Sequence, residues 1–245
     1  MSCPEFSIVM PAYNARKFIH ESINSVLNQT YGDFELIVIN DGSTDDTGVV
    51  VSGSSSVDSR VKLIDNKVNK GVAASRNDGV AFASGRYICF LDADDLWFPE
   101  KLEVQKRYFS QGYDYLFSSY LKFWPSGKER LIVPPERTSF NALLKGNYIG
   151  NLTGAYDTKS IGKVFQKRIG HEDYLMWLEI AKIAKSGFGI QIPLAKYRVH
   201  NDSLSSNKIR SALWSWNIYR NELNFGLVRS LMLFGSYAIN SLRKI

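Results

Sequence analysis

The sequence predicts an α/β protein built on a mostly parallel β-sheet with helices on both faces. Short apolar runs alternate with segments of helical periodicity over residues 6–91, and this alternation is typical of a parallel sheet. The apolar runs, such as ELIVI at residues 35–39, are almost continuous, as expected of strands that are buried on both faces.

Four strands are predicted in the first half of the chain, each ending in polar residues. Residues 6–10 read FSIVM and end at Pro11, and residues 34–40 read FELIVIN ahead of the turn cluster DGSTD. A third strand is predicted at residues 61–65, and a fourth at residues 86–91, directly before Asp92.

Two helices are predicted between these strands. Residues 18–27 place apolar side chains on one face over three turns, and residues 71–84 form a second helix that ends at Gly85. The segment SGSSS at residues 52–56 is interpreted as a small polar loop.

The second half of the chain is less regular. Segments 113–122 and 130–133 flank Pro-Ser-Gly and predict a hairpin. A helix is predicted at residues 172–185 and a late strand at residues 189–199.

Composition excludes several classes of protein. The chain is 44% apolar and 22% charged, which excludes disordered, collagen-like and coiled-coil proteins. No segment reaches the roughly 20 apolar residues of a spanning helix, and residues 1–5 do not resemble a signal peptide. The two cysteines, Cys3 and Cys89, make no disulfide framework, so we expect a reducing, cytoplasmic location.

The positive charge is concentrated at the C-terminus. The net charge is 30 − 24 = +6, and residues 205–245 hold six basic residues against one acid, which leaves only +1 for residues 1–204. We therefore expect one domain over residues 1–204, followed by a basic, aromatic-rich helical tail over residues 205–245, and no nucleic-acid partner. The tail either lies on an anionic membrane or packs on the body or on a second copy of the chain.

Polar residues gather just after the predicted strands. Tyr13, Asn14, Asp41, Asp92 and Asp94 all follow strands, and ligands bind outside the carboxyl ends of the strands in open α/β sheets. The sequence therefore predicts a ligand site at this edge.

The densest cluster of acids is Asp92-Ala93-Asp94-Asp95. Carboxylates this close repel one another unless a cation compensates, and oxygen ligands suit Mg²⁺ or Mn²⁺ shared with substrate phosphates. The alternative is a solvated turn in which Asp95 caps the next helix.

Three further segments offer binding or catalytic groups, each with a structural alternative. Asp41 can accept a hydrogen bond from a base or ribose, or belong to a turn. Gly71 and Arg76 suit a diphosphate, although Arg76 also suits a structural ion pair. Glu172 and Asp173 begin a helix, where acids favour the helix dipole, or one of them is a general base.

Taken together, three blocks resemble the family 2 glycosyltransferases, which have the GT-A fold. They are FSIVMPAYNARKFIHESINSVLNQTYGDFELIVINDGSTDDT, NKGVAASRNDGVAFASGRYICFLDADDLWFPEKL and GHEDYLMWLEIA. The resemblance implies a Rossmann-like α/β domain with a mostly parallel central sheet flanked by helices and followed by the helical tail.

The resemblance also implies a role for each matched residue. Pro11, Ala12 and Tyr13 match the loop around the uracil, Asp41 the acid that recognises the base, and Arg76 an arginine that approaches the nucleotide. Asn14 and Gly71 are expected as further residues that bind the nucleotide-sugar. Asp92-Ala93-Asp94 matches the D-x-D motif, with Asp92 towards the ribose and Asp94 towards the metal, while Asp95 borders the donor sugar or acceptor. Asp173 matches the catalytic base, with Glu172 beside it. His200 in YRVHNDSLS matches a histidine that completes the metal site in some members, and Arg198 would then face the diphosphate.

The function implied is inverting transfer of a hexose or N-acetylhexosamine from a UDP-sugar to a lipid-linked or oligosaccharide acceptor, with Mn²⁺ or Mg²⁺, in surface-polysaccharide synthesis at the inner face of the cell membrane. Two alternatives stay open. One is a sugar-nucleotide pyrophosphorylase, although MPAYNARK lacks the Gly-rich, Arg-containing loop expected after its first strand. The other is an inactive nucleotide- or carbohydrate-binding relative.

Overall fold

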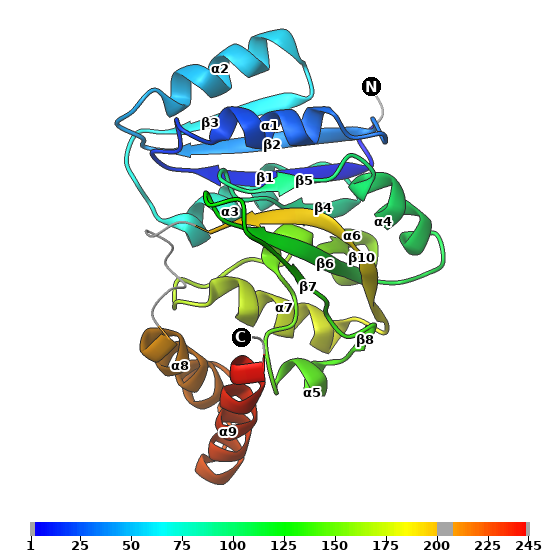
Figure 1. The fold of residues 1–245 in the computed structure, drawn as a ribbon, viewed down its shortest axis with the longest axis vertical. Helices are drawn as coiled ribbons and strands as arrows, with labels where there is room; N and C mark the ends of the chain where they lie inside the picture. The colour runs from blue at the N-terminus through cyan, green and yellow to red at the C-terminus, as the bar shows by residue number, and fades with distance from the viewer. Residues whose placement is uncertain (1–2, 200–207, 244–245) are drawn as a thin grey trace.

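A computed structural model of the chain describes residues 3–199 and 208–243 (Figure 1). One sheet has the strand order β3-β2-β1-β4-β9-β6-β10-β5, with β7 paired to β6 and β8 paired to β10. The strands are β1 (Phe6–Ala12), β2 (Phe34–Asp41), β3 (Val61–Asn66), β4 (Tyr87–Phe90), β5 (Leu96–Trp97), β6 (Tyr115–Phe123), β7 (Glu129–Ile132), β8 (Arg137–Thr138), β9 (Ala155–Asp157) and β10 (Gly187–Arg198).

Helices cover both faces of this sheet. They are α1 (Ile19–Leu27), α2 (Thr47–Val57), α3 (Val72–Phe82), α4 (Lys101–Phe109), α5 (Phe140–Leu143), α6 (Thr158–Ile161), α7 (Glu172–Ile183), α8 (Lys208–Asn217) and α9 (Leu227–Arg243), with a 3-10 turn at Asn151–Thr153 and a π-helical turn at Ile218–Glu222.

The sheet is mostly parallel, as the sequence predicts. The pairs β2–β3, β1–β2, β1–β4 and β6–β10 are parallel, and the short β9 is antiparallel to both β4 and β6. Because β9 reverses direction between two neighbours, β3, β2, β1, β4, β6 and β10 all run the same way. Their carboxyl ends therefore lie along one edge.

Alternate residues of each central strand belong to different cores. Ile8 and Met10 of β1 pack with α1, α2 and α4, whereas Val9 between them packs with α3 and α7 on the other face. All three side chains are 0% exposed, as period-two alternation in a doubly covered strand requires. A Cβ at Gly79 would lie only 2.5 Å from Val9 Cγ1, so glycine at this position allows α3 to lie very close to the sheet.

Two sequence predictions about the first half are wrong. The SGSSS segment lies inside α2, where Ser54 Oγ donates to the Val50 carbonyl and Ser56 Oγ to the Gly53 carbonyl, so these serines satisfy their hydroxyls within the helix. Strand β1 also continues past Pro11 to Ala12. The Val9 carbonyl accepts from the Leu91 N–H, so Val9 faces β4 with its backbone polar groups. Pro11, two residues further along β1, faces the same side but lies beyond the last residue of β4. Its lack of an N–H therefore costs no hydrogen bond between β1 and β4.

The hairpin, the late helix and the late strand of the second half are confirmed as β6–β7, α7 and β10, with ends shifted by up to two residues. Helices α8 and α9 lie below α7 in Figure 1. Across residues 3–199 and 208–243, no helix combines the length and apolar character needed to cross a bilayer.

Candidate active site

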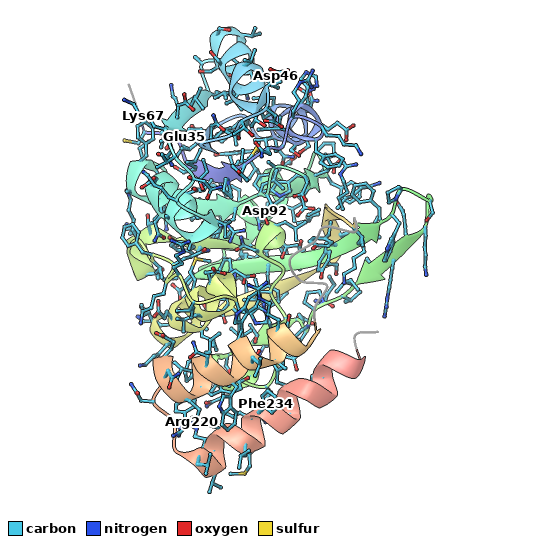
Figure 2. The ribbon with its side chains drawn as sticks, turned by 90° about the vertical axis from the view of Figure 1, so that its left-hand side faces the viewer. Glu35, Asp46, Lys67, Asp92, Arg220 and Phe234 are labelled. Carbon is cyan, nitrogen blue, oxygen red and sulfur yellow. The ribbon has the colours of Figure 1, made fainter. Side chains whose placement is uncertain are left out.

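The loops that follow β2, β1 and β4 emerge side by side, because these three strands are parallel neighbours in the sheet. Asp41 ends β2, Tyr13 and Asn14 follow β1, and Asp92 follows β4. Figure 2 shows Asp92 near the middle of the molecule. The predicted convergence of these segments on one edge is confirmed.

The loop after β1 is fastened to the loop after β2. The Asn14 N–H donates to Ser43 Oγ at 3.0 Å, and the Thr44 N–H donates to Asn14 Oδ1 at 2.8 Å. Asn14 has a left-handed backbone, with φ of 47°. Pro11 and Ala12 are buried at the base of this loop, whereas Tyr13 is 50% exposed.

Asp41 organises the loop that precedes α3. Its carboxylate is 3% exposed and accepts hydrogen bonds from the Lys70 N–H at 3.0 Å and the Gly71 N–H at 2.8 Å. Asn66 Nδ2 donates to the same carboxylate at 3.2 Å. Gly71, with φ of +90°, then begins the helix that presents Arg76.

Arg76 forms the ion pair that the sequence left as an alternative. It is 7% exposed, and its guanidinium donates to Asp92 Oδ1 at 2.6 Å and to Gln166 Oε1 at 3.3 Å. Burial alone would lower the pKa of Arg76, but Asp92, with smaller contributions from Asp173 and Glu172, outweighs burial and raises it. The carboxylates of Asp92, Asp173 and Glu172 therefore all favour the charged form of Arg76.

Asp95 is a buried acid, and the interpretation of it as a helix cap is wrong. The next helix, α4, begins at Lys101 after Glu100. Asp95 is 1% exposed, and its Oδ1 accepts from the Arg198 N–H at 2.8 Å. Its Oδ2 is buried and has no hydrogen-bond partner among the residues that the structure describes. Burial, followed by repulsion from Asp94 and Asp92, raises its pKa well above the ordinary value.

Arg198 fixes the acidic loop from β10. Its Nε donates to the Asp94 carbonyl at 2.8 Å, and its Nη2 donates to Glu21 Oε2 at 2.6 Å. The guanidinium also lies 4.7 Å from the ring centroids of both Phe18 and Phe123. These contacts hold the backbone of Asp94 in place, so that its half-buried carboxylate keeps a defined position.

Glu172 and Asp173 occupy the first turn of α7, where the helix dipole favours negative charge. Two residues with positive φ precede them, Gly170 at 73° and His171 at 49°. The segment before this turn is held against α3: the Gln166 N–H donates to Asn77 Oδ1 at 2.7 Å. Both acids lie near enough to Arg76, the ion-pair partner of Asp92, to help raise its pKa.

The donor set at this edge fits a divalent metal. Within the described part of the chain, no three His, Cys, Asp or Glu side chains come close enough to hold an ion alone. One or two carboxylates completed by substrate phosphates are the usual environment of Mg²⁺, and the half-buried carboxylate of Asp94 could supply one such ligand. His200, the other predicted ligand, lies outside the described residues.

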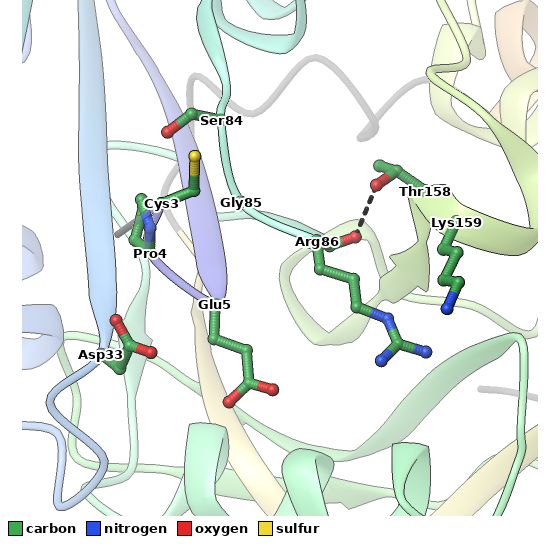
Figure 3. Close-up of a pocket in the computed structure, with 9 residues that line it drawn as sticks. All are labelled: Cys3, Pro4, Glu5, Asp33, Ser84, Gly85, Arg86, Thr158 and Lys159. Atoms are coloured by element: carbon green, nitrogen blue, oxygen red, sulfur yellow. Dashed lines mark hydrogen bonds between the residues drawn. The ribbon is translucent and has the colours of Figure 1, made fainter. Parts of the chain in front are cut away.

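A shallow hollow lies elsewhere on the molecule, where the chain enters β1 and β4 (Figure 3). Thr158 and Arg86 are joined there by a 2.8 Å hydrogen bond from Thr158 Oγ1 to the Arg86 carbonyl. This hollow lies at the amino ends of the strands and holds none of the predicted site residues. Its lining residues are Cys3, Pro4, Glu5, Asp33, Ser84, Gly85, Arg86, Thr158 and Lys159.

Sequence reasoning missed Glu21 and Gln166 as partners of the site arginines. Glu21 lies on α1 and Gln166 in an irregular segment, and neither belongs to a motif that would have singled it out. Only the folded structure shows their contacts, Glu21 with Arg198 and Gln166 with Arg76.

The fold and the carboxylate-lined edge define an α/β protein with a candidate ligand site at the carboxyl ends of its strands. The chain belongs to glycosyl transferase family 2, whose family model matches residues 7–161. The chain is therefore a glycosyltransferase.

A relative in sequence and two solved structures are consistent with this family assignment. The Escherichia coli UDP-Glc:α-D-GlcNAc-diphosphoundecaprenol β-1,3-glucosyltransferase WfgD is 35% identical, with 97% of this chain and 94% of that protein covered. The Staphylococcus aureus TarS fragment solved with UDP-GlcNAc has a TM-score of 0.75 at 18% identity, covering 96% of this chain and 71% of that one. A Pyrobaculum calidifontis mannosyltransferase solved with GDP-Man and Mn²⁺ has a TM-score of 0.69 at 18% identity, covering 92% and 66%. The two solved structures support the GT-A fold.

Proposed function

We propose that this chain is an inverting glycosyltransferase that moves a hexose or N-acetylhexosamine from a UDP-sugar to a hydroxyl of a polyprenyl-diphosphate-linked sugar. The product would be a repeat unit of a surface polysaccharide such as an O-antigen, capsule or exopolysaccharide. The observation that supports this proposal most is that Glu172 and Asp173 lie near enough to Arg76, which pairs with Asp92 at 2.6 Å, to help raise the pKa of Arg76. The activity for which WfgD is named, from UDP-Glc to α-D-GlcNAc-diphosphoundecaprenol, supports the donor and acceptor classes.

In this proposal the first half of the chain binds the donor. Pro11, Ala12 and Tyr13 surround the uracil, which Asp41 recognises. Asn14, Gly71 and Arg76 also bind the nucleotide-sugar. Asp92 binds the ribose, Asp94 holds Mn²⁺ or Mg²⁺, and Arg198 faces the diphosphate. His200 is proposed as a further metal ligand.

In the reaction, the bond between the sugar carbon and the diphosphate oxygen breaks, and UDP leaves with the electron pair. The acceptor oxygen attacks the opposite face of that carbon, and its proton passes to the Asp173 carboxylate, a step worth about 10²–10⁴-fold in rate. A bound divalent metal supplies charge neutralisation for the diphosphate. Glu172 adds negative charge beside the base, and Asp95 borders the donor sugar or the acceptor.

We also propose that the tail lies on an anionic membrane, where such an acceptor would be found. Helix α9 exposes an apolar face in which Leu227 is 56% exposed, Val228 70%, Leu231 54% and Met232 64%. Arg229 is exposed beside this face. Apolar residues edged by basic ones are typical of helices that lie in a membrane interface.

Calorimetry of UDP binding with Mn²⁺ and then with a chelator tests the donor site. We expect tight binding only with the metal, and transfer from UDP-sugars to a polyprenyl-diphosphate-linked sugar. Absence of UDP binding in both conditions would refute the donor assignment. Binding of UDP without transfer to any lipid-linked sugar would refute the acceptor class.

Flotation with anionic vesicles tests the membrane contact. Leu231→Asp should lower vesicle binding about tenfold or more, because burial of a leucine side chain is worth about 1.5–3 kcal/mol. The matched control is Val57→Asp at the end of α2, where valine is 90% exposed on another part of the molecule. Equal binding by wild type and Leu231→Asp would show that α9 does not enter the membrane.

A further inference from the structure

We propose that Trp214, in the C-terminal tail, is a positioning residue for the catalytic acids because its indole holds the turn that leads into α7. The inference rests on the proposed role of Asp173 as the base. It assigns the tail a part in catalysis that is separate from any contact with a membrane.

The indole of Trp214 lies directly against the backbone of this turn. A Cβ built on Gly170 would lie 2.3 Å from Trp214 Cε2 and 2.4 Å from Nε1, closer than any side chain allows. Glycine at position 170 thus permits the indole to touch the main chain. Its φ of +73° also favours glycine there.

The same indole packs against His171, the residue before the two acids. The ring centroids of His171 and Trp214 are 5.2 Å apart at 64°, and the centroid of the Tyr174 ring lies 6.4 Å from that of the imidazole. Nδ1 of His171 is buried and has no hydrogen-bond partner within the described residues. Packing, rather than hydrogen bonding at Nδ1, therefore holds the imidazole between the tail and α7.

The turn needs such support because its backbone is strained. His171 is a non-glycine residue with φ of 49°, a conformation that costs on the order of 1–3 kcal/mol and persists only when the surroundings enforce it. The His171 carbonyl accepts the Leu175 N–H at 3.2 Å, so a change in the turn would alter the first turn of α7. Glu172 and Asp173 lie in that first turn.

The tail has other anchors, so that loss of the indole does not detach it. Tyr219 Oη donates to the Leu144 carbonyl at 2.7 Å, and Lys167 pairs with Glu222 at 2.8 Å. Asn240 Nδ2 donates to the Lys145 carbonyl at 2.8 Å. A substitution at position 214 therefore changes the contact with the turn and leaves the attachment of the tail in place.

The experiment compares Trp214→Ala with Trp216→Ala in the full-length chain. Trp216 is a matched control because it lies on the same helix but packs on Phe234 of α9, at a centroid distance of 5.7 Å. We expect kcat for sugar transfer to fall about 10²-fold in Trp214→Ala, since a displacement of about 1 Å can cost that much. UDP affinity and the KM for the donor should change less than about twofold, because the donor loops are elsewhere, and Trp216→Ala should keep its kcat.

A second readout does not depend on activity. The chain has three histidines, so the imidazole of His171 can be followed by NMR and assigned with a His171→Gln variant. Burial lowers the pKa of His171, with Asp173 and Glu172 partly offsetting the effect. Removing the indole should raise this pKa towards its ordinary value in Trp214→Ala but not in Trp216→Ala.

The outcomes separate this inference from the proposed function. An unchanged His171 titration in Trp214→Ala, or an equal loss of kcat in both alanine variants, would overturn it. If Trp214→Ala does not fold, Trp214→Phe and Gly170→Ala take its place. Trp214→Phe, which keeps an aromatic ring on the turn, should retain most of the kcat, whereas Gly170→Ala, whose Cβ would meet the indole, should lose about 10²-fold; full activity of Gly170→Ala would overturn the inference. A wild-type chain that transfers no sugar would refute the proposed function, and the histidine readout would still test the contact.

Discussion

Replacing Lys101 by methionine should stabilise the protein at neutral pH. Lys101 begins α4, is 0% exposed, and its Nζ donates to the Thr153 carbonyl at 3.1 Å while lying 4.6 Å from the Trp97 ring. Burial, partly offset by Cys89, lowers its pKa to about 8. The charged form therefore costs the folded state free energy whenever it is present.

The magnitude follows from the two pKa values. An unfolded lysine titrates near 10.4, so a folded pKa of about 8 corresponds to a penalty of about 3 kcal/mol below that pH. The bond to Thr153 and the contact with Trp97 offset about 1 kcal/mol each. Methionine matches the lysine stem in volume, and Gln105 Nε2 still donates to the Thr153 carbonyl at 3.0 Å. The net gain should be about 1 kcal/mol, or about 2–4 °C in Tm for a chain of this size.

Urea unfolding at about pH 7 and about pH 9.5 measures both the gain and its origin. Between the folded and unfolded pKa values the unfolded chain binds more protons, so the stability of the wild type should rise with pH over that interval. This rise in stability should be smaller in Lys101→Met. The control is Lys67→Met, at an exposed lysine in a loop, which should keep the rise and change the free energy of unfolding by no more than about 0.5 kcal/mol. A Lys101→Met protein less stable than the wild type at neutral pH would refute the reasoning.

Three further predictions concern the site and the tail. Asp173→Asn should lower kcat about 10²–10⁴-fold with UDP affinity unchanged, and wild-type turnover would remove Asp173 from the role of base. Asp94→Ala should weaken UDP binding in the presence of Mn²⁺ but not with a chelator, so equal affinity at fixed metal would exclude a metal-binding role. Tyr219→Phe should lower stability by about 1–2 kcal/mol, because it leaves the buried Leu144 carbonyl without its 2.7 Å donor; an unchanged Tm would contradict that estimate.

The central strands were predictable because their local pattern matches their environment. Strand β2 is buried throughout and reads as a continuous apolar run. Helix α2 was missed because only Thr47 and Val51 of it are buried, so that it has no apolar stripe for periodicity to reveal. Strand β9 spans three residues, too few for a pattern, and its existence depends on pairing with β4 and β6.

The candidate site was predictable only where strand order determines it. Asp41 and Asp92 end parallel strands on either side of β1, so that their proximity follows from topology alone. The partners that hold the site in place lie far apart in the chain: Arg198 and Glu21 are 177 residues apart, and Arg76 and Gln166 are 90 apart. Contacts of this range depend on tertiary packing, and a single sequence holds no local signal for them.

The two hydrophobic cores, one on each face of the sheet, also bear on how such an enzyme diversifies. The core beneath α1, α2 and α4 supports the loop after β1, whereas the core on the other face includes α3, α5, α7 and the tail. Helix α3 carries Arg76 and α7 carries the proposed base, so one packed layer supports both groups. A change of acceptor that is reached through this second core must therefore preserve the packing of α3 on the sheet, and with it the position of Arg76.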